Sequence, residues 1–506
     1  MNNKILNIQN FFLLFAIALI TVIAMPACKK DKTSGPPAIS EVRSYVASPN
    51  DTIINGLTVN EQLTDGQWVV ISGQNLKDAV QIKFNGVPAS FNSTLFTQNN
   101  AVVRIPSISF STIDTTKLYT LEYTTLSGTT KFSFKLGPAA PTIEAISNVF
   151  ANPGDSVFIY GTNLVLIQSF SYGGTKIPSF KMNTAGNSLG FVMPNPAPTT
   201  GDVVVITKSG TVNFKISATP TITGVSNENA IGGDSVYVYG TYFKKVQTFT
   251  FAGATITSFN AADDGNSIGF VMPSISTSGP VSITTPFGTA TTVYKVNDIG
   301  SGTGSISNWE WGGNFNWAWW GGANLISGDP NSGWPPYSSD FPGNTSLYMV
   351  LQRGPLSSGE GNTWSNYAIL MNGAQWIPSG NMNDPIDNFA FKFEVNIPQD
   401  WNGGSIDIQS SDATYICRWE PWQMSATATA PYKTKGWKTI TIPFSKFRNT
   451  DATLGDGKGS SIKKFADLLG PSGNSACTVY LHNYSTATTA TGFYGAFDNI
   501  RVVKIK

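Results

Sequence analysis

Tryptophan is the residue whose distribution first suggests chemistry in this sequence. Of the 13 tryptophans, 12 lie between Trp309 and Trp437, and Trp68 stands alone before them. Indole is large and carries an N–H that needs a partner, so a core rarely uses many of them. Their crowding in a segment rich in Gly and Asn predicts exposed aromatic platforms. Such platforms stack on flat apolar faces, and sugar rings offer faces of that kind.

The residues around each indole indicate which ones should be exposed. Trp334, Trp364 and Trp376 lie among Gly, Asn, Ser and Pro residues, the composition of loops rather than of an apolar strand. They are the first candidates for stacking on a ligand. Trp320 belongs to a partly alternating segment rich in tryptophan and is a further candidate. Trp437 begins an apolar strand and is predicted to lie in the core.

A second candidate cluster combines charge with indole. On a predicted strand, Arg418 and Glu420 share one face, and Trp419 lies on the other, with Trp422 shortly after. Arg and Glu beside an indole would hydrogen-bond the hydroxyls of a sugar while a ring stacks on it. The alternative is a surface ion pair beside a packed Trp, and both interpretations remain open.

An internal repeat organises the N-terminal part of the chain, which precedes the tryptophan-rich segment. Residues 153–164 recur as residues 232–243, and residues 66–76 are a more distant copy. Gly73, Gly161 and Gly240 occupy the same place in the three copies, and we expect positive φ there. Short alternating apolar runs between Gly and Pro predict strands, and units of this length suit a small β-sandwich.

The tryptophan-rich end, residues 298–506, is predicted to be one larger all-β domain. In the run 388–398, the phenylalanines alternate with Lys392, Glu394 and Asn396, which should form the polar face of a strand. Trp309 and Trp311 lie next to the Gly/Ser joint that precedes the domain and are interpreted as sealing it against the third repeat. Further strands are predicted at 404–409, 414–419, 436–443, 478–484 and 492–505.

The N-terminus indicates export. An apolar run over residues 11–25 has the length of a signal sequence, and Ala27 stands directly before Cys28, with lysines behind it. This arrangement resembles a bacterial lipobox and predicts lipidation of Cys28. An ordinary signal peptide or an anchor helix is the alternative. Outside the cytoplasm, Cys417 and Cys477 either form a disulfide or remain separate buried thiols.

Composition excludes several kinds of function. Charged residues make up only 12% and the net charge is +1, so nothing indicates electrostatic binding of nucleic acid. His482 is the single histidine, and it cannot by itself make a Ser/His/Asp arrangement or a histidine-based metal site. We therefore expect no metal, no cofactor and no catalytic residues. The carboxylates that a glycoside hydrolase would need lie in no recognisable motif: Glu310, Glu360, Asp387, Glu394 and Glu420.

Two sets of residues resemble known domain types. The strand-Gly-x-x-hydrophobic pattern of Gly73, Gly161 and Gly240 resembles IPT/TIG domains, which are immunoglobulin-like. The segments 436–443 and 497–502 resemble strands of galactose-binding-like jelly rolls. The expected fold is all-β, with three tandem Ig-like sandwiches and a larger jelly-roll-like sandwich. The expected segments are a signal peptide (1–27), a lipidated tether (28–36), Ig-like repeats (37–137, 138–218 and 219–297) and the C-terminal domain (298–506).

The whole arrangement resembles the cell-surface glycan-binding lipoproteins of Bacteroidota polysaccharide-utilisation loci, of the type with IPT/TIG repeats and a xyloglucan-binding-like domain. The resemblance implies that the terminal domain binds xyloglucan or another β-glycan, that the repeats are spacers, and that Cys28 anchors the protein in the outer membrane facing outward. It also implies a TonB-dependent transporter and its glycan-binding lid lipoprotein as partners. An adhesin that binds protein and, less favoured, a glycoside hydrolase are the alternatives.

Overall fold

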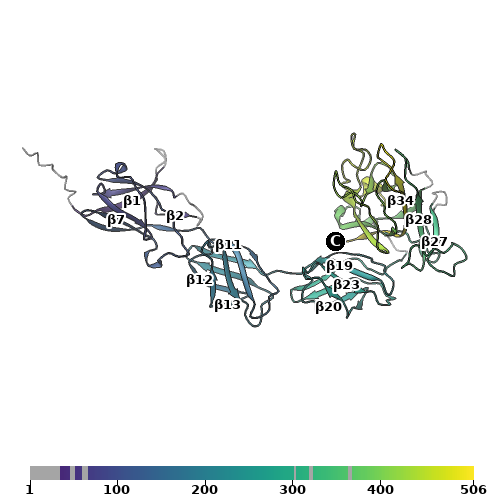
Figure 1. Cartoon of the computed structure of the whole chain (residues 1–506), viewed down its shortest axis with the longest axis horizontal. Coiled ribbons are helices and arrows are strands. Elements are labelled where there is room, and N and C mark those ends of the chain that lie inside the picture. Colours follow the sequence, from purple (N-terminus) through teal and green to yellow (C-terminus); the bar gives the residue numbers. More distant parts are fainter. Residues whose placement is uncertain (1–34, 46–51, 60–65, 301–303, 318–322, 363–366) are drawn as a thin grey trace, which may run out of the picture. The chain divides into compact units, whose positions relative to one another are not determined.

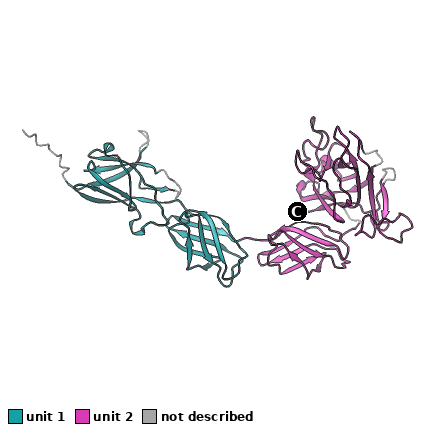
Figure 2. Cartoon of the chain, viewed as in Figure 1, with its two compact units in different colours: residues 1–216 teal, residues 217–506 magenta. Residues whose placement is uncertain are grey.

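A computed structural model describes residues 35–45, 52–59, 66–300, 304–317, 323–362 and 367–506. The chain divides into two compact units, residues 1–216 and 217–506 (Figure 2). Within the described residues, no helix has the length and apolar character needed to cross a bilayer. Almost all of the regular structure is β-strand (Figure 1), and the expected all-β class is confirmed.

The first repeat is a sandwich of short antiparallel strands. Its described strands form the sheets β1-β3-β6 and β5-β4-β7-β8, and β2 pairs with β9 in parallel. Their bounds are β1 (Ala38–Ser44), β2 (Gly56–Val59), β3 (Trp68–Gln74), β4 (Ala79–Phe84), β5 (Val87–Pro88), β6 (Asn100–Arg104), β7 (Thr120–Thr125), β8 (Gly128–Ser133) and β9 (Lys135–Pro138).

The second and third repeats have the same topology as each other. The second forms the sheets β10-β11-β15-β14 and β13-β12-β16-β17, from β10 (Thr142–Ile146), β11 (Ser156–Thr162), β12 (Ile167–Tyr172), β13 (Thr175–Lys176), β14 (Phe180–Met182), β15 (Ser188–Val192), β16 (Asp202–Thr207) and β17 (Gly210–Lys215). The third forms β18-β19-β23-β22 and β21-β20-β24-β25, from β18 (Thr221–Val225), β19 (Ser235–Thr241), β20 (Thr248–Phe251), β21 (Ala254–Thr255), β22 (Asn260–Ala261), β23 (Ser267–Val271), β24 (Ser282–Thr285) and β25 (Gly288–Thr291).

The glycine shared by the repeats has a different purpose from the one expected. Positive φ occurs two residues later, at Asn75, Asn163 and Tyr242, and not at the glycine. A Cβ on Gly161 or Gly240 would lie 1.9 Å from a carbonyl oxygen of the paired strand. That strand changes register opposite the glycine in each repeat. Close backbone approach at a bulge, rather than a left-handed turn, therefore requires glycine.

The C-terminal domain is a two-sheet sandwich. One sheet has the order β27-β28-β35-β30-β33, with β26 on β35, and the other is β29-β34-β31-β32. Its strands are β26 (Ser305–Ser307), β27 (Asn324–Ser327), β28 (Leu347–Arg353), β29 (Ala368–Gln375), β30 (Phe389–Asn396), β31 (Ser405–Ser410), β32 (Ile416–Trp419), β33 (Lys438–Pro443), β34 (Asn474–His482) and β35 (Phe493–Lys504). Short helical turns connect some of them, including the α-helix α2 (Ala466–Leu469). The six strands predicted in this domain are all present.

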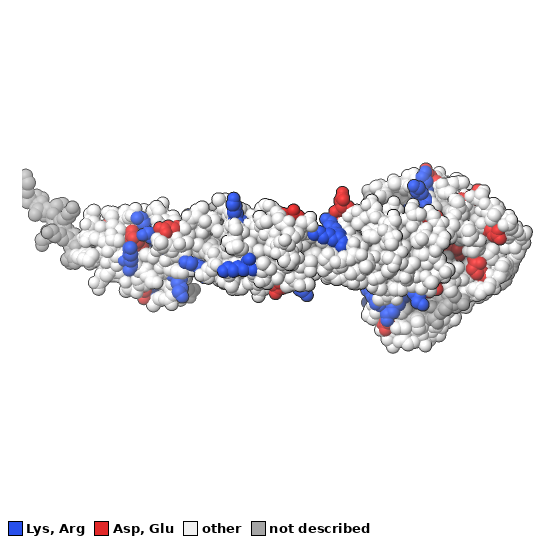
Figure 3. Space-filling model, turned by 90° about the horizontal axis from the view of Figure 1, so that it is seen from below, with Lys and Arg blue, Asp and Glu red and all other residues white. Residues whose placement is uncertain are grey.

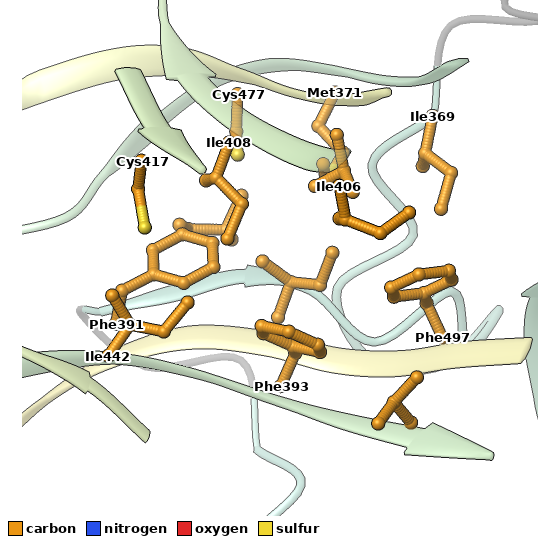
Figure 4. Close-up of a cluster of buried hydrophobic side chains, with 14 of the residues drawn as sticks. Ile369, Met371, Phe391, Phe393, Ile406, Ile408, Cys417, Ile442, Cys477 and Phe497 are labelled. Carbon is orange, nitrogen blue, oxygen red and sulfur yellow. The ribbon is translucent and has the colours of Figure 1, made fainter. Parts of the chain in front are cut away.

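The core lies between these two sheets. Figure 4 shows Phe391, Phe393 and Phe497 from one sheet facing Ile406 and Ile408 from the other. Alternation along β30 places its phenylalanines in this core, as predicted. Cys417 and Cys477 lie in the same core as separate, buried, free thiols. Of the two interpretations of these cysteines, the structure agrees with unpaired buried thiols.

The polar face of β30 is not exposed. Lys392, Glu394 and Asn396 are each at most 2% exposed, and Lys392 donates a hydrogen bond to Glu228 of the third repeat. Within this second unit, Thr439 on β33 donates its backbone N–H to Ser226 O of the third repeat at 2.8 Å. The sequence correctly predicts that these three residues share one face of the strand, and the structure shows that this face is buried. Alternation fixes which residues share a face, but not what covers that face.

Candidate functional site

Three aromatic side chains form a stack before and after β27. Trp311 lies on Phe315, with ring centroids 4.1 Å apart and planes 20° apart, and Trp334 lies 5.8 Å from Trp311 at 30°. Both indoles are 57% exposed. Holding so much indole in water is unfavourable unless a partner covers it, so a group of exposed rings indicates a binding surface.

A groove lies beside Trp334 on the outer face of the sheet β27-β28-β35. Its lining combines rings with amides and hydroxyls: Trp317, Ala323, Asn324, Leu325, Ile326, Trp334, Pro336, Ser338, Phe341, Val350, Gln352 and Tyr494. Tyr494 donates its hydroxyl to Asp340 at 2.6 Å, which fixes the orientation of its ring. Rings for stacking and side-chain amides for hydrogen bonding are the groups that an uncharged polyhydroxylated ligand requires.

A second pocket contains the predicted charged pair. Arg418 donates from Nε and Nη2 to Glu420 Oε1 at 3.0 and 2.5 Å, and Lys458 donates to Glu420 Oε2 at 2.8 Å. Trp422 lines the same pocket, and its indole N–H donates to Gly404 O at 2.8 Å. The side chains of Arg418 and Glu420 are only 10% and 8% exposed. The pair is thus built into the pocket wall and is not a loose surface ion pair.

Tyr484 connects this pocket to a buried carboxyl group. The Arg418 guanidinium lies 3.7 Å from the Tyr484 ring centroid, and the Tyr484 hydroxyl donates to Asp407 Oδ2 at 2.6 Å. Burial raises the pKa of Asp407 to about 6, although hydrogen bonds from Ser405 and Tyr484 act in the opposite direction. Asp407 is fully buried and therefore supports the pocket from behind without reaching a ligand.

The structure separates the predicted stacking residues into exposed and buried sets. Trp334 is exposed, as expected, and Trp422 is half-buried at a pocket. Trp376 is completely buried and donates its N–H to Ser475 O at 3.0 Å. The expectation that Trp376 is a platform was wrong. Trp419 packs against the core, with three aromatic neighbours, Phe393, Trp401 and Tyr432, within 5.8 Å between ring centroids.

Of the other residues singled out in the sequence, some lie outside the described part of the chain and some are buried. Cys28, Trp320 and Trp364 lie outside the described residues. Trp309 is buried in the core of the C-terminal sandwich rather than at the joint. Trp437 is buried as predicted, and it packs on Tyr348 outside the main core.

Trp311 is the functional candidate that sequence reasoning missed. It was interpreted as sealing the joint, but it is exposed and stacked on Phe315 and Trp334. Its Gly-rich surroundings, Gly312 and Gly313, are the same loop signal that drew attention to Trp334.

Two of the carboxylates that a hydrolase could use, Glu360 and Glu310, make hydrogen bonds within the domain. Hydrogen bonds from Ser357, Arg353 and Tyr367 lower the pKa of Glu360 to about 2, which keeps it ionised at neutral pH. Glu310 accepts from the backbone N–H of Leu347 at 3.0 Å. Among the described residues, no group of His, Cys, Asp and Glu side chains is arranged to hold a metal ion.

Comparison with known proteins identifies the domain that carries these sites. Residues 299–504 match the family described as the surface glycan-binding protein B xyloglucan-binding domain. The C-terminal domain of this chain belongs to that family. The xyloglucan-binding-like C-terminal domain that the sequence predicts is confirmed. No curated protein is similar enough to count as a match.

One solved structure shares the fold of the chain, and two others are similar at lower scores. A crystal structure determined with a xylogluco-oligosaccharide aligns over 92% of this chain and 99% of its own, with 18% identity and a TM-score of 0.57. Surface glycan-binding protein B from a complex xyloglucan utilisation locus of Bacteroides uniformis covers 72% of this chain and 100% of its own, with 19% identity and a TM-score of 0.39. The corresponding Bacteroides ovatus protein of a mixed-linkage glucan locus, in complex with a heptasaccharide, covers 88% and 94%, with 12% identity and a TM-score of 0.22.

Proposed function

We propose that this protein binds a plant-type β-glucan, xyloglucan or a related glucan, through its C-terminal domain and does not cleave it. The observation that carries this proposal is the exposed stack of Trp311 and Trp334 beside a groove lined by amides and hydroxyls. The membership of residues 299–504 in a glycan-binding domain family supports the same ligand class. An uncharged ligand suits the surface, since charged side chains are sparse on the face in Figure 3.

The affinity should come from several weak contacts. Each aromatic stacking contact contributes about 1 kcal/mol beyond the burial of area. Two or three rings with a few hydrogen bonds would therefore bind an oligosaccharide in roughly the micromolar range. Many copies held on one surface would bind a long polymer more tightly, because each additional contact becomes intramolecular.

The cellular setting completes the proposal. Lipidation at Cys28 would hold the chain on the outer membrane with its C-terminal domain facing outward. There it would capture polysaccharide for a TonB-dependent transporter and its glycan-binding lid lipoprotein. The absence of catalysis is proposed because Glu360 and Glu420 are occupied by ion pairs within the domain.

Affinity electrophoresis of the full chain in gels that contain xyloglucan, mixed-linkage glucan or mannan tests the proposal. We expect retardation by at least one β-glucan, which Trp334→Ala and Trp311→Ala each weaken about tenfold, without release of reducing sugar. Trp68→Ala is the matched control, because Trp68 is also an exposed indole, 42% exposed, but lies in the first repeat. Release of sugar would contradict the non-catalytic assignment, and no retardation by any glycan would favour an adhesin.

A second set of variants tests the pocket at Trp422. Trp422→Ala and Arg418→Met remove a ring and a charge from its wall while leaving the groove beside Trp334 intact. If the groove is the main site, these two variants should keep most of the affinity. A larger loss from Trp422→Ala than from Trp334→Ala would instead assign the main site to the pocket of Arg418 and Glu420.

A further inference from the structure

The second and third repeats each carry a pair of exposed aromatic rings at equivalent positions. On β19, Tyr237 and Tyr239 are 47% and 45% exposed, with ring centroids 6.4 Å apart and planes 14° apart. On β11, the pair is Phe158 and Tyr160, with centroids 6.5 Å apart and planes 19° apart. The two rings of each pair are thus nearly parallel to each other, and both are exposed on the outer face of their sheet.

A glycine on the neighbouring strand lets one ring of each pair approach the sheet closely. Tyr237 is paired with Gly269, and a Cβ on that glycine would come within 2.9 Å of the Tyr237 ring. Phe158 has the same relationship to Gly190, also at 2.9 Å. The ring thus packs against the glycine, while nearly half of the residue remains exposed to solvent. Glycine within a strand often marks such a close approach.

The first repeat shows that the fold does not require this arrangement. Its equivalent residues on β3 are Val70 and Ser72, and their partners on β6 are Val102 and Asn100. The first repeat therefore builds the same pair of strands without rings and without the opposing glycine. The two later repeats have both the exposed pair of rings and the glycine on the neighbouring strand. This joint occurrence favours a role for the exposed rings other than folding.

A groove runs beside Tyr237 on the third repeat. Its lining includes hydroxyls and one amide but no charged side chain: Ser235, Tyr237, Ser258, Phe259, Asn260, Ala262, Ser267, Gly269, Phe270 and Val271. A charged peptide or a nucleic acid would find no countercharge in this groove. An uncharged polyhydroxylated chain would find a flat ring for its apolar face and hydrogen-bonding groups for its hydroxyls.

We propose that Tyr237 and Tyr239, with Ser258 and Asn260 beside them, form an additional and weaker site for an uncharged polysaccharide on the third repeat. Phe158 and Tyr160 form the equivalent platform on the second repeat. This inference rests on the proposed function of the C-terminal domain, because the ligand is the same polymer. The two repeats then add binding sites to the chain and are more than spacers.

The test replaces the platform with the residues of the first repeat. Tyr237→Val with Tyr239→Ser in the full chain installs the pair that Val70 and Ser72 form there, so the variant should fold; a calorimetric scan checks this. The conservative control, Tyr237→Phe with Tyr239→Phe, keeps both rings. Retardation by xyloglucan polymer in affinity gels should weaken about fivefold in the Val/Ser variant and remain near the parent in the Phe variant.

Tryptophan fluorescence separates this inference from the proposed function. The third repeat contains no tryptophan, so a titration with a xyloglucan heptasaccharide that changes indole emission reports on the C-terminal domain. We expect the same midpoint in the parent and in the Val/Ser variant. Unchanged polymer retardation in the Val/Ser variant, with the fluorescence titration intact, would overturn the additional site and leave the proposed function standing. No binding in either assay would overturn both.

Discussion

Arg501 on β35 donates from Nη2 to Glu228 Oε2 of the third repeat at 2.7 Å. Lys392 on β30 donates to the other oxygen of the same carboxylate. All three side chains are almost completely buried. Glu394 on β30 also accepts hydrogen bonds from Arg501, at 2.7 and 2.9 Å. Two cations and two carboxylates are therefore buried together, and one of the carboxylates comes from the third repeat. Burial alone would raise the pKa of Glu228, but the charges of Lys392 and Arg501 hold it below its ordinary value.

Removal of the Glu228 carboxylate should destabilise the contact between the third repeat and the C-terminal domain. Glu228→Ala leaves two buried cations with less countercharge, and breaking a buried pair in this way costs about 3 to 5 kcal/mol of unfolding free energy. Denaturant unfolding followed by tryptophan emission measures the loss. Asp400→Ala is the control, because Asp400 pairs with Lys433 at 2.9 Å on the exposed surface, where such pairs contribute below about 1 kcal/mol. Equal effects of the two variants would contradict the assigned role of Glu228.

The bulge glycines make a separate prediction about the repeats. Gly240→Ala would place a Cβ 1.9 Å from Thr221 O and 2.4 Å from the Phe243 ring. We expect a loss of about 2 kcal/mol or more in the unfolding free energy of the third repeat, since both strands must shift. Scanning calorimetry measures it. Gly224→Ala is the matched control in the paired strand, because a Cβ there meets nothing within 4 Å; a similar loss in both variants would exclude the steric explanation.

The strands were predictable because alternation and turn residues are local signals. The phenylalanines of β30 face the core as expected, and the repeat offset predicted two sandwiches of equal topology. The environment of Lys392 and Glu394 was not predictable, because their partners Glu228 and Arg501 are more than 100 residues away in the chain. Nothing in the local sequence distinguishes a polar face that meets water from one that meets another domain.

The candidate site was predictable only in part, because loop composition is a local signal and burial depends on long-range contacts. Loop composition correctly indicated exposure of Trp334 but gave the same signal for Trp376. The difference lies in long-range contacts: the Trp376 N–H finds Ser475 O, 99 residues away, and its ring packs on Phe391. Trp311 was missed because its stacking partner Trp334 lies across the segment that contains β27.

Truncation of Trp376 should therefore lower the stability of the protein, whereas truncation of Trp334 should lower its affinity for glycan. Trp376→Ala removes a fully buried indole and should cost about 3 to 5 kcal/mol of unfolding free energy. Trp334→Ala removes an exposed ring and should change stability by less than about 0.5 kcal/mol. Chemical denaturation together with affinity electrophoresis tests both. A stable Trp376→Ala variant with lost binding would reverse the assignment of Trp376 to the core.

Asp407 provides a prediction about pH. Its folded pKa of about 6 lies above the ordinary value, 3.8, because burial disfavours the charged form. Between about pH 4 and pH 6 the folded state therefore holds more protons than the unfolded state. The unfolding free energy that Asp407 contributes must fall as the pH rises through this window, by roughly 3 kcal/mol for about two pKa units.

Asp407→Asn isolates this contribution, because Asn does not titrate and can still accept a hydrogen bond from Tyr484 or Ser405. The difference in unfolding free energy, variant minus parent, should increase by about 3 kcal/mol from pH 3 to pH 7. Urea unfolding of the C-terminal domain, followed by tryptophan emission at several pH values, measures it. Hydrogen bonds that the variant loses lower its unfolding free energy by the same amount at every pH, so they do not affect the pH dependence of the difference. A difference that stays constant with pH would show that Asp407 is ionised throughout in the folded protein, and that Arg418 and its hydrogen bonds outweigh its burial.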